Sequence, residues 1–350
     1  MLGNMNIKNI SLYKFKIPFK SSIRLNNIQL HHRSGYIIGL ESNDNKIGYG
    51  EISPLPGSHK ETLDDVLREL KTYREKSNSI EKSYFSPSLK FGIDSALLNL
   101  KSKQNGKSQY QLLSDKHNQT ITINGLIVEP EKDLELKIKM LFNTGYNTIK
   151  IKVGRLDIDQ EIKIVKQFNK LADNKIKLRL DANCKWSYSE AEYFYKSIKS
   201  SEILEYIEEP LSDVHVLEKL YRDKSIPLAL DENLEKIKLN YPKLMQKAKA
   251  LILKPPIIGS LNKTLDYINY SKANNISPVI SDTFQSGFGI SMLCFLASSI
   301  PQKSTAMGLN TYDYLKDDIL INRLKFDNGK IDLYSIDNSL NMNKLTKVKI

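Results

Sequence analysis

The sequence predicts an α/β fold: a (β/α) barrel preceded by an α+β domain. Three observations predict it. Short apolar runs recur from about residue 120 onward, and their starts lie 22 to 29 residues apart. Between the runs, apolar residues fall at helical spacing. The first 117 residues lack this repeat. A repeat of this length accommodates one strand, one helix and two loops.

The apolar runs are the predicted barrel strands. Segments between them, such as 159–172 and 189–201, carry apolar residues every three or four positions and can cover the outside of a sheet. Eight strands alternating with helices indicate a TIM-like barrel. An open doubly wound sheet stays the alternative, although its usual G-x-G-x-x-G turn after the first strand is missing. The runs span residues 120–126, 148–153, 177–183, 205–210, 227–232, 250–256, 277–283 and 305–311.

The chain divides into three predicted parts. Residues 1–117 contain strand-like stretches separated by turns, followed by helix-like stretches, which predicts an α+β domain. Residues 118–321 form the predicted barrel. Residues 322–350 contain short strand-like pieces, and we expect this C-terminal segment to return to the first domain.

Composition limits the classes of protein that the chain can belong to. Its 350 residues are 40% hydrophobic, which is enough for a large core. No run of 18 apolar residues occurs, and the start lacks the order of a secretory signal, so we expect a cytoplasmic protein with no membrane partner. With only two cysteines, Cys184 and Cys294, neither a disulfide framework nor a zinc site is indicated, and any metal should have oxygen ligands.

The formal charge of +12 raises the question of a nucleic-acid partner. The excess is nearly all Lys, whereas Arg is the residue favoured for bidentate contacts to phosphates and bases. The basic residues are also scattered, without a long run. We therefore expect a small-molecule ligand and no nucleic acid. A homo-oligomer stays open.

Three carboxylates end successive predicted strands: Asp181, Glu208 and Asp231. Because residues at the carboxyl ends of barrel strands meet at one rim, these side chains would repel one another unless a cation lay between them. Oxygen ligands of this kind suit Mg²⁺, or Mn²⁺, rather than Zn²⁺. The alternative is that each acid caps the following helix, which explains one such residue better than three on consecutive strands.

Lysines lie at the same level on two other strands. Lys150 and Lys152 alternate with apolar residues on the second strand, and Lys254 ends the sixth, where Pro255 stops it. Near one another and near a divalent cation, their pKa is expected to fall towards the range of a general base. A metal with lysines on opposite faces of one cavity suits removal of a proton α to a carboxylate.

These motifs resemble the enolase superfamily, and the resemblance covers nearly the whole chain. It implies a (β/α)7β-type, TIM-like barrel as the catalytic domain (118–321) and an α+β capping domain (1–117) that closes over the barrel mouth. It also implies a metal held by the three carboxylates, and lysines as acid and base. The motifs in order are K-x-K (Lys150, Lys152), D-x-N (Asp181, Asn183), E-E-P (Glu208, Glu209, Pro210), D-E (Asp231, Glu232) and K-P (Lys254, Pro255).

Within that superfamily the chain is most similar to the o-succinylbenzoate synthases of menaquinone biosynthesis. The similarity lies in residues 50–63, 87–100, 228–234, 254–261, 279–289 and 306–320. It implies dehydration of 2-succinyl-6-hydroxy-2,4-cyclohexadiene-1-carboxylate to o-succinylbenzoate through an enediolate.

The same resemblance implies a role for each motif residue. Lys152 removes the α proton and returns it to the departing hydroxyl on the same face. Lys254 stabilises the anion from the other face, and Lys150 tunes Lys152. Asn183 and Glu232 lie next to the lysines and metal ligands and hold them in position.

The seventh and eighth strands depart from the pattern of the relatives. Asp282 and Gln285 replace residues that are usually Ser or Ala and Glu, and Asn310 replaces an Asp. An added acid near a substrate carboxylate is unfavourable unless it points away. The substrate contacts implied here are Ser281, Gln285 and Gly308.

Other readings stay open. An N-acylamino-acid racemase or a dipeptide epimerase would use the same lysines and metal but return the proton to carbon. Dipeptide epimerases carry Asp-x-Asp at the eighth strand, where this chain has residues 310–312, Asn-Thr-Tyr. From a different class, the chain could be a catalytically silent barrel or a basic nucleic-acid-binding protein. Neither of these needs the lysines and carboxylates together.

Overall fold

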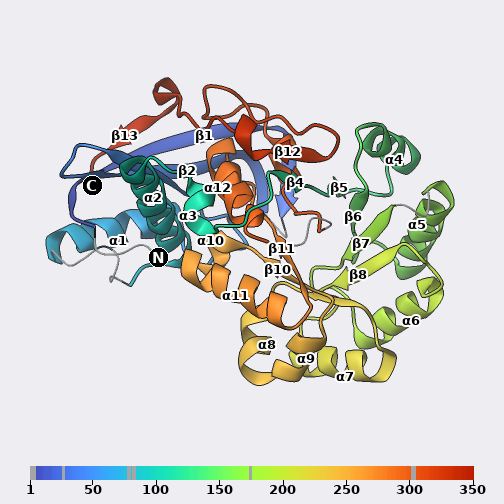
Figure 1. The fold of residues 1–350 in the computed structure, drawn as a ribbon. Helices are drawn as coiled ribbons and strands as arrows, with labels where there is room; N and C mark the ends of the chain where they lie inside the picture. Colours follow the sequence, from blue (N-terminus) through green and yellow to red (C-terminus); the bar gives the residue numbers. More distant parts are fainter. Residues whose placement is uncertain (1–4, 26–27, 77–79, 81–83, 173–175, 301–304) are drawn as a thin grey trace.

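The computed structural model describes residues 5–25, 28–76, 80, 84–172, 176–300 and 305–350. An antiparallel sheet with two long helices forms one end of the molecule, and a curled parallel sheet wrapped by helices forms the other (Figure 1). The α/β class with a capping domain, predicted from the sequence, is confirmed.

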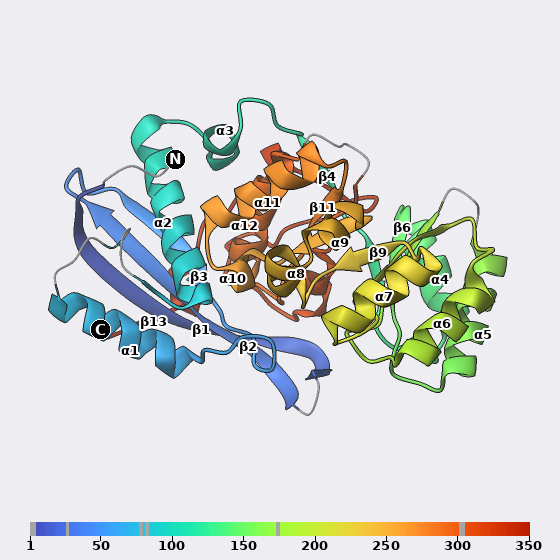
Figure 2. The same cartoon turned by 90° about the horizontal axis from the view of Figure 1, so that it is seen from below.

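The capping sheet has the strand order β13-β1-β2-β3. Helices α1 (Leu63–Lys76) and α2 (Pro87–Asn105) cover one face of it (Figure 2). Helix α2 approaches β3 very closely: a Cβ atom added to Gly50 would lie 1.9 Å from the carbonyl oxygen of Gly92. Glycine is therefore required for this contact. The strands are β1 (Ile7–Leu25), β2 (Ile28–Ser42), β3 (Ile47–Ile52) and β13 (Thr346–Val348).

The second sheet is parallel and has seven strands in the order β11-β10-β9-β8-β7-β6-β5. Its central strands are buried along most of their length, as expected where helices cover the outside and side chains fill the inside. These strands are β5 (Gly125–Ile127), β6 (Thr148–Lys152), β7 (Lys177–Asp181), β8 (Leu204–Glu208), β9 (Leu228–Leu230), β10 (Ala250–Leu253) and β11 (Ser277–Ile280).

The two ends of the predicted strand series differ from expectation. The first run divides into β4 (Thr120–Thr122), which pairs with β12 (Lys330–Asp332), and β5, which joins the parallel sheet. The eighth run makes only isolated bridges, from Met307 to Ile123 and from Gly308 to Ser281. These bridges still join the two edges of the sheet, because the backbone of residues 307–308 bonds to both neighbours. The run then turns into the short helix η1 (Asn310–Tyr314).

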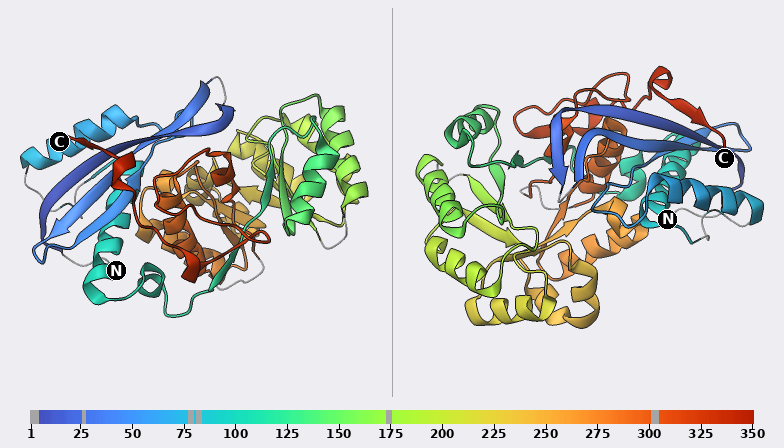
Figure 3. Two further views of the ribbon diagram at one scale, coloured as in Figure 1. Left: turned by 90° about the horizontal axis from the view of Figure 1, so that it is seen from above. Right: turned by 180° about the vertical axis from the view of Figure 1, so that it is seen from behind.

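Helices surround the parallel sheet (Figure 3). Several begin at side-chain caps: Asp157 accepts from the amide of Asp159, and Ser187 with Glu190 forms a capping box. The helices are α3 (Gln109–Leu113), α4 (Leu134–Asn143), α5 (Ile158–Leu171), α6 (Tyr188–Ile198), α7 (Val214–Lys224), α8 (Leu234–Asn240), α9 (Pro242–Lys247), α10 (Pro255–Ile258), α11 (Leu261–Ala273) and α12 (Gly287–Ser298).

The end of the chain crosses both halves of the molecule. β12 lies beside β4 near the barrel, the short helices η2 (Leu333–Ser335) and η3 (Met342–Lys344) follow it, and β13 pairs with β1 in the capping sheet. The boundaries at residues 117 and 321 stay predictions. Within the described ranges, no helix is both long and apolar enough to cross a membrane.

Candidate active site

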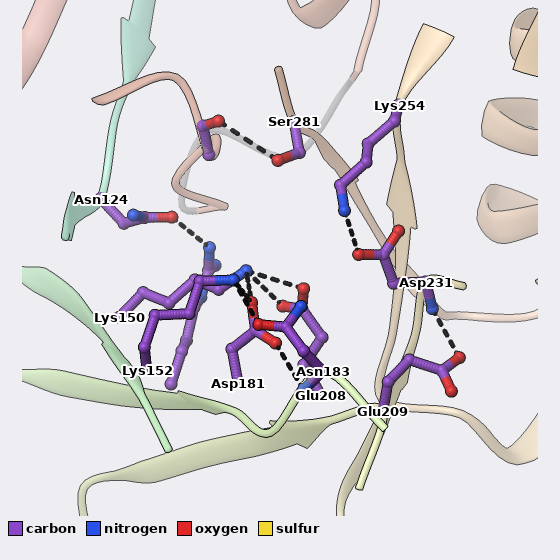
Figure 4. Close-up of polar contacts among 12 residues, drawn as sticks. Asn124, Lys150, Lys152, Asp181, Asn183, Glu208, Glu209, Asp231, Lys254 and Ser281 are labelled. Atoms are coloured by element: carbon purple, nitrogen blue, oxygen red, sulfur yellow. Dashed lines mark hydrogen bonds and ion pairs between the residues drawn. The ribbon is translucent and has the colours of Figure 1, made fainter. Parts of the chain in front are cut away.

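The parallel strands alternate between an outer face and an interior, and the interior is closed below the mouth by a small apolar cluster. On β6, Ile149 and Ile151 belong to the large core, while Lys150 and Lys152 point inward (Figure 4). Moving two residues along a strand keeps a side chain on the same face. The polar residues at the strand ends therefore lie above the cluster, whose members are Tyr206, Ala229, Ala250, Ile252 and Val279.

Lys150 links two of the predicted metal ligands. Asp181 and Glu208 are opposite each other in the β7–β8 register, and both side chains are buried. The Nζ atom of Lys150 lies 2.7 Å from Oδ2 of Asp181 and 2.7 and 2.8 Å from the two Oε atoms of Glu208. A single ammonium group thus donates to both carboxylates.

Lys152 also contacts Asp181, and its side chain is more exposed than that of Lys150. Its Nζ donates to Oδ2 of Asp181 at 2.7 Å and to Oδ1 of Asn183 at 2.8 Å. The amide of Asn183 then donates to Oε1 of Glu232 at 3.0 Å. The structure therefore brings Lys152 together with Asn183 and Glu232, the two residues expected to support it.

Lys254 comes from the other side of the interior (Figure 4). It donates to Oδ2 of Asp231, the third predicted ligand. Lys254 and the pair on β6 thus approach the space between them from different strands. The predicted arrangement of lysines on two faces, with carboxylates between them, is the arrangement observed.

Burial and charge shift the pKa values of these groups in opposite directions. Burial, followed by repulsion from Asp181, raises the pKa of Glu208 to about 8, and burial raises that of Asp231 to about 6. For Asp181, attraction to the ammonium groups outweighs burial, and its pKa lies below its usual range. Burial lowers the pKa of Lys150 and Lys254, but nearby carboxylates outweigh it and raise both values. The lowered pKa values expected from the sequence are therefore wrong for Lys150 and Lys254, because the neighbouring carboxylates favour the ammonium form of both.

The three carboxylates fit an oxygen-preferring cation such as Mg²⁺ or Mn²⁺ by their chemistry. They are buried at adjacent strand ends, and lysine ammonium groups neutralise them. Among the described residues, the only three potential ligand atoms within 4.8 Å of one another belong to Cys184, Glu209 and Glu232. That group suits Mg²⁺ poorly, since burial and nearby carboxylates raise the pKa of the Cys184 thiol and keep it neutral.

Two buried charged residues near the site were not assigned from the sequence. Glu209 accepts from the amides of Asp231 and Asn233, at 2.8 and 3.3 Å, and so holds the loop that carries a predicted ligand. Arg179 lies inside the barrel, two residues before Asp181, and donates to the carbonyl oxygen of Ala306 at 2.7 Å. A charge on the inward face of an apolar strand is the signal that would have identified Arg179.

The predicted substrate contacts lie together but differ in orientation. Ser281 faces the interior, and its hydroxyl lies 3.3 Å from the carbonyl oxygen of Gly308. The side chain of Gln285 folds back on its own turn, with its oxygen 2.7 Å from the Thr283 amide and its nitrogen 2.6 Å from the Thr283 hydroxyl. Ser281 and Gly308 therefore border the interior, while Gln285 shapes the turn. The substrate-binding roles of all three stay predictions.

Asp282 follows Ser281 directly and is buried. Its Oδ1 accepts from the amide of Phe284 at 3.0 Å and from the hydroxyl of Thr311. Its charge acts on Cys294 of helix α12 and interacts with the charges of Lys254 and Arg33. The added acid noted in the sequence is therefore accompanied by two cations, and one of them, Lys254, belongs to the site.

Family models match both halves of the chain. Residues 134–335 match the model described as Enolase C-terminal domain-like, and residues 7–100 match the model described as MenC, N-terminal domain. The first of these matches covers more than half of the 350 residues.

Two known proteins illustrate the relationship. An o-succinylbenzoate synthase from Pasteurella multocida is 27% identical over 321 residues, which are 88% of this chain and 90% of that protein. Protein PHYLLO, chloroplastic, from Arabidopsis thaliana is 27% identical over 366 residues, which cover 90% of this chain. The chain spans only 21% of the length of PHYLLO.

The fold recurs in solved structures. A dipeptide epimerase from Enterococcus faecalis V583, complexed with Mg and the dipeptide L-Leu-L-Tyr, superposes with a TM-score of 0.82 at 21% sequence identity. The match covers 98% of this chain and all of that one. The family-model matches, the superposed fold and the charged residues at the strand ends agree, and the chain therefore belongs to the enolase superfamily.

Proposed function

We propose that this chain is an o-succinylbenzoate synthase, a hydro-lyase of menaquinone biosynthesis. The reaction is the Mg²⁺-dependent syn dehydration of 2-succinyl-6-hydroxy-2,4-cyclohexadiene-1-carboxylate. The capping region matches the MenC N-terminal model, and the Pasteurella relative carries this name over most of both chains. The observation that carries the chemistry is the convergence of Lys152 and Lys254, from different strands, on one group of buried carboxylates.

In the proposed reaction Lys152 acts as base and then as acid. Its Nζ takes the proton from the carbon α to the ring carboxylate, which leaves an enediolate anion. The same nitrogen then gives its proton to the departing hydroxyl on that face, so that water leaves and the ring becomes aromatic. Lys152 suits this task better than Lys150, because its side chain is 24% exposed against 12% and donates to one carboxylate instead of two.

The other lysines act through charge. Lys254 lies across the interior from Lys152, where a positive charge stabilises the anion without receiving the proton. Lys150 sits between two carboxylates and carries a raised pKa, so it stays an ammonium group beside Lys152.

Asp181, Glu208 and Asp231 would hold the metal. A bound Mg²⁺ would supply positive charge that stabilises the substrate carboxylate as it gains negative charge. Asn183 positions Lys152, and Glu232 in turn holds Asn183. The proposed ligand is a small carboxylate whose succinyl end lies towards Ser281 and Gly308, with the turn shaped by Gln285.

The decisive experiment compares two substrate classes. Purified protein with Mg²⁺ is incubated with the cyclohexadiene substrate and, separately, with N-succinyl amino acids in D₂O. We expect an aromatic product from the first and little α-deuteration in the second. No aromatic product together with rapid α-deuteration would identify an N-acylamino-acid racemase instead.

The racemase and epimerase functions are the second candidate, since the same enediolate serves both outcomes. The Enterococcus dipeptide epimerase shares this fold. Against dipeptides, the chain has Asn310, whose amide donates to the Tyr146 hydroxyl at 2.9 Å and to Asp313 at 2.8 Å. An amide engaged in this way offers no carboxylate for a substrate ammonium group.

A further inference from the structure

A buried acid of the capping sheet caps a helix of the barrel. Glu51, on β3, is 5% exposed. Its Oε1 lies 3.2 Å from the amide of Ser286, and its Oε2 lies 3.0 Å from the amide of Gly289 and accepts from the Ser286 hydroxyl. These groups form the N-terminus of α12, where free amides favour a negative charge. Glu51 of the capping sheet thus accepts hydrogen bonds from the free amides at the start of barrel helix α12.

A buried cation of the same sheet holds the turn that precedes α12. Arg33, on β2, is 2% exposed, and its Nε donates to the carbonyl oxygen of Phe284 at 2.9 Å. Its guanidinium also donates to the carbonyl oxygens of Ser53 and Pro54. Because the Ser53 hydroxyl donates to Glu51 at 2.7 Å, the acid and the cation form one connected group.

Phe284 adopts a backbone conformation that needs outside support. Its φ is 59°, in the left-handed region that a bulky residue rarely occupies. Its ring makes edge contacts with Phe19 of the capping sheet and with Tyr314, with centroids 5.7 and 6.2 Å apart. The bond from Arg33 and these two rings hold the turn in this shape.

The turn held in this way is the one that borders the site. Residues 281–286, the β11–α12 turn, begin at Ser281, which faces the interior, and include Gln285, which braces the turn. We propose that Arg33 and Glu51 are positioning residues that set the shape of the β11–α12 turn, so that binding of the substrate depends on the capping sheet. This inference rests on the proposed function, because the substrate is the one proposed above.

Asp94 provides a matched control. It is a buried acid of the capping region, on α2, and its Oδ2 accepts from the amide of Leu261 at 3.1 Å, at the start of barrel helix α11. Like Glu51, it therefore joins the cap to a helix N-terminus. It does not contact the β11–α12 turn.

The test uses the full chain and three variants: E51Q, S286A and D94N. We expect E51Q to raise KM for the cyclohexadiene substrate about tenfold while kcat changes less than about threefold, since a charged hydrogen bond at the turn is lost. S286A removes one donor to Glu51 with little disturbance and should raise KM about threefold. D94N should leave both constants within about twofold.

Amide hydrogen exchange provides a readout that does not depend on turnover. The amides of Ser286 and Gly289 should exchange about tenfold faster in E51Q, and faster to a smaller degree in S286A, but not in D94N. An unchanged KM and unchanged exchange in E51Q, or an equal rise of KM in D94N, would overturn the proposal. If E51Q does not fold, S286A is judged by the same criteria. A wild-type protein without turnover would refute the proposed function alone, and the exchange rates would still decide whether Glu51 shapes the turn.

Discussion

The mouth of the barrel has two halves that are built differently. From β6 to β10 the inward side chains are lysines and carboxylates paired with each other, as in Lys152 with Asp181 and Lys254 with Asp231. From β11 to η1, here called the neutral half, hydroxyl, amide and backbone groups bond to one another, as Ser281 does with Gly308. Its two acids, Asp282 and Asp313, accept from the neutral side chains of Thr311 and Asn310. The charged half suits proton transfer, and the neutral half suits recognition.

The halves also differ in what positions them. Residues of the charged half stand on or directly after regular strands, where alternation decides the direction of each side chain. Residues of the neutral half stand on isolated bridges and on the β11–α12 turn, whose shape depends on Arg33 and Glu51 of another domain. Substitutions in the charged half should therefore change chemistry, and those in the neutral half should change binding or stability.

The largest effect is expected from Lys152→Ala. Loss of the proposed base and acid should reduce kcat/KM about 1,000-fold or more, measured by formation of the aromatic product. Lys177→Ala, at the exposed start of β7, is the control and should retain activity. Circular dichroism should show that both variants are folded. If Lys152→Ala still forms the aromatic product, Lys152 is not the base, and the charged half does not carry out the proton transfer.

The second effect concerns the metal. With Mg²⁺ at about 100 times its dissociation constant, the wild-type protein should gain about 2.7 kcal/mol of unfolding free energy, measured as a rise in Tm. Glu208→Gln should lose most of that gain, because a proposed carboxylate ligand becomes a neutral amide. Glu41→Gln, in the capping sheet, should respond to Mg²⁺ like the wild type. An undiminished rise in Glu208→Gln would mean that the cation binds elsewhere.

A third test places a charge in the neutral half. Asn310→Asp would set a carboxylate against Asp313, to which the Asn310 amide now donates at 2.8 Å. The free energy of unfolding should fall by about 1–3 kcal/mol, measured by urea denaturation. Adding Asp313→Asn should restore most of the loss. A single variant as stable as the wild type would show that this half tolerates a second acid beside Asp313.

The smallest effect is expected from pH on the metal-free protein. Burial and the Asp181 charge raise the pKa of Glu208 to about 8, so the folded state holds this proton more tightly than the unfolded state. The resulting stability is complete below the ordinary pKa of a glutamate and is lost as the pH rises through about 8. Between pH 7 and 9, Tm should therefore fall, by about 2 °C. Glu208→Gln should show a smaller fall, and an equal fall would assign the effect to other groups.

Much of the charged half could be predicted because its signals are local. A lysine or an aspartate that interrupts an apolar strand is conspicuous, and the two-residue period shows which of these residues share the interior with Lys150. Arg179 also interrupts an apolar strand, but it lies two residues before the end of β7 and belongs to none of the strand-end motifs. The split of the first predicted strand was missed because β12, its partner, is more than 200 residues away.

The neutral half could not be predicted in the same way. Asp282 looked unfavourable in the sequence, and the structure shows that the charges of Lys254 and Arg33 act on it, with one of its oxygens on the amide of Phe284. The bonds of the Gln285 side chain to Thr283 were also not foreseen, and its expected contact with the substrate stays a prediction. Turn conformations depend on contacts made across the whole chain, which periodicity does not record.

The sequence by itself determined the order of the strands and which side chains face the interior, because a strand's period is a property of its own residues. Only the tertiary structure decided the ionic state and the shape of the site. The pKa of Glu208 depends on burial and on Asp181, which belongs to another strand. The form of the β11–α12 turn depends on Arg33 and Glu51, more than 200 residues away. Such effects arise from distances in space, which separation along the chain does not reveal.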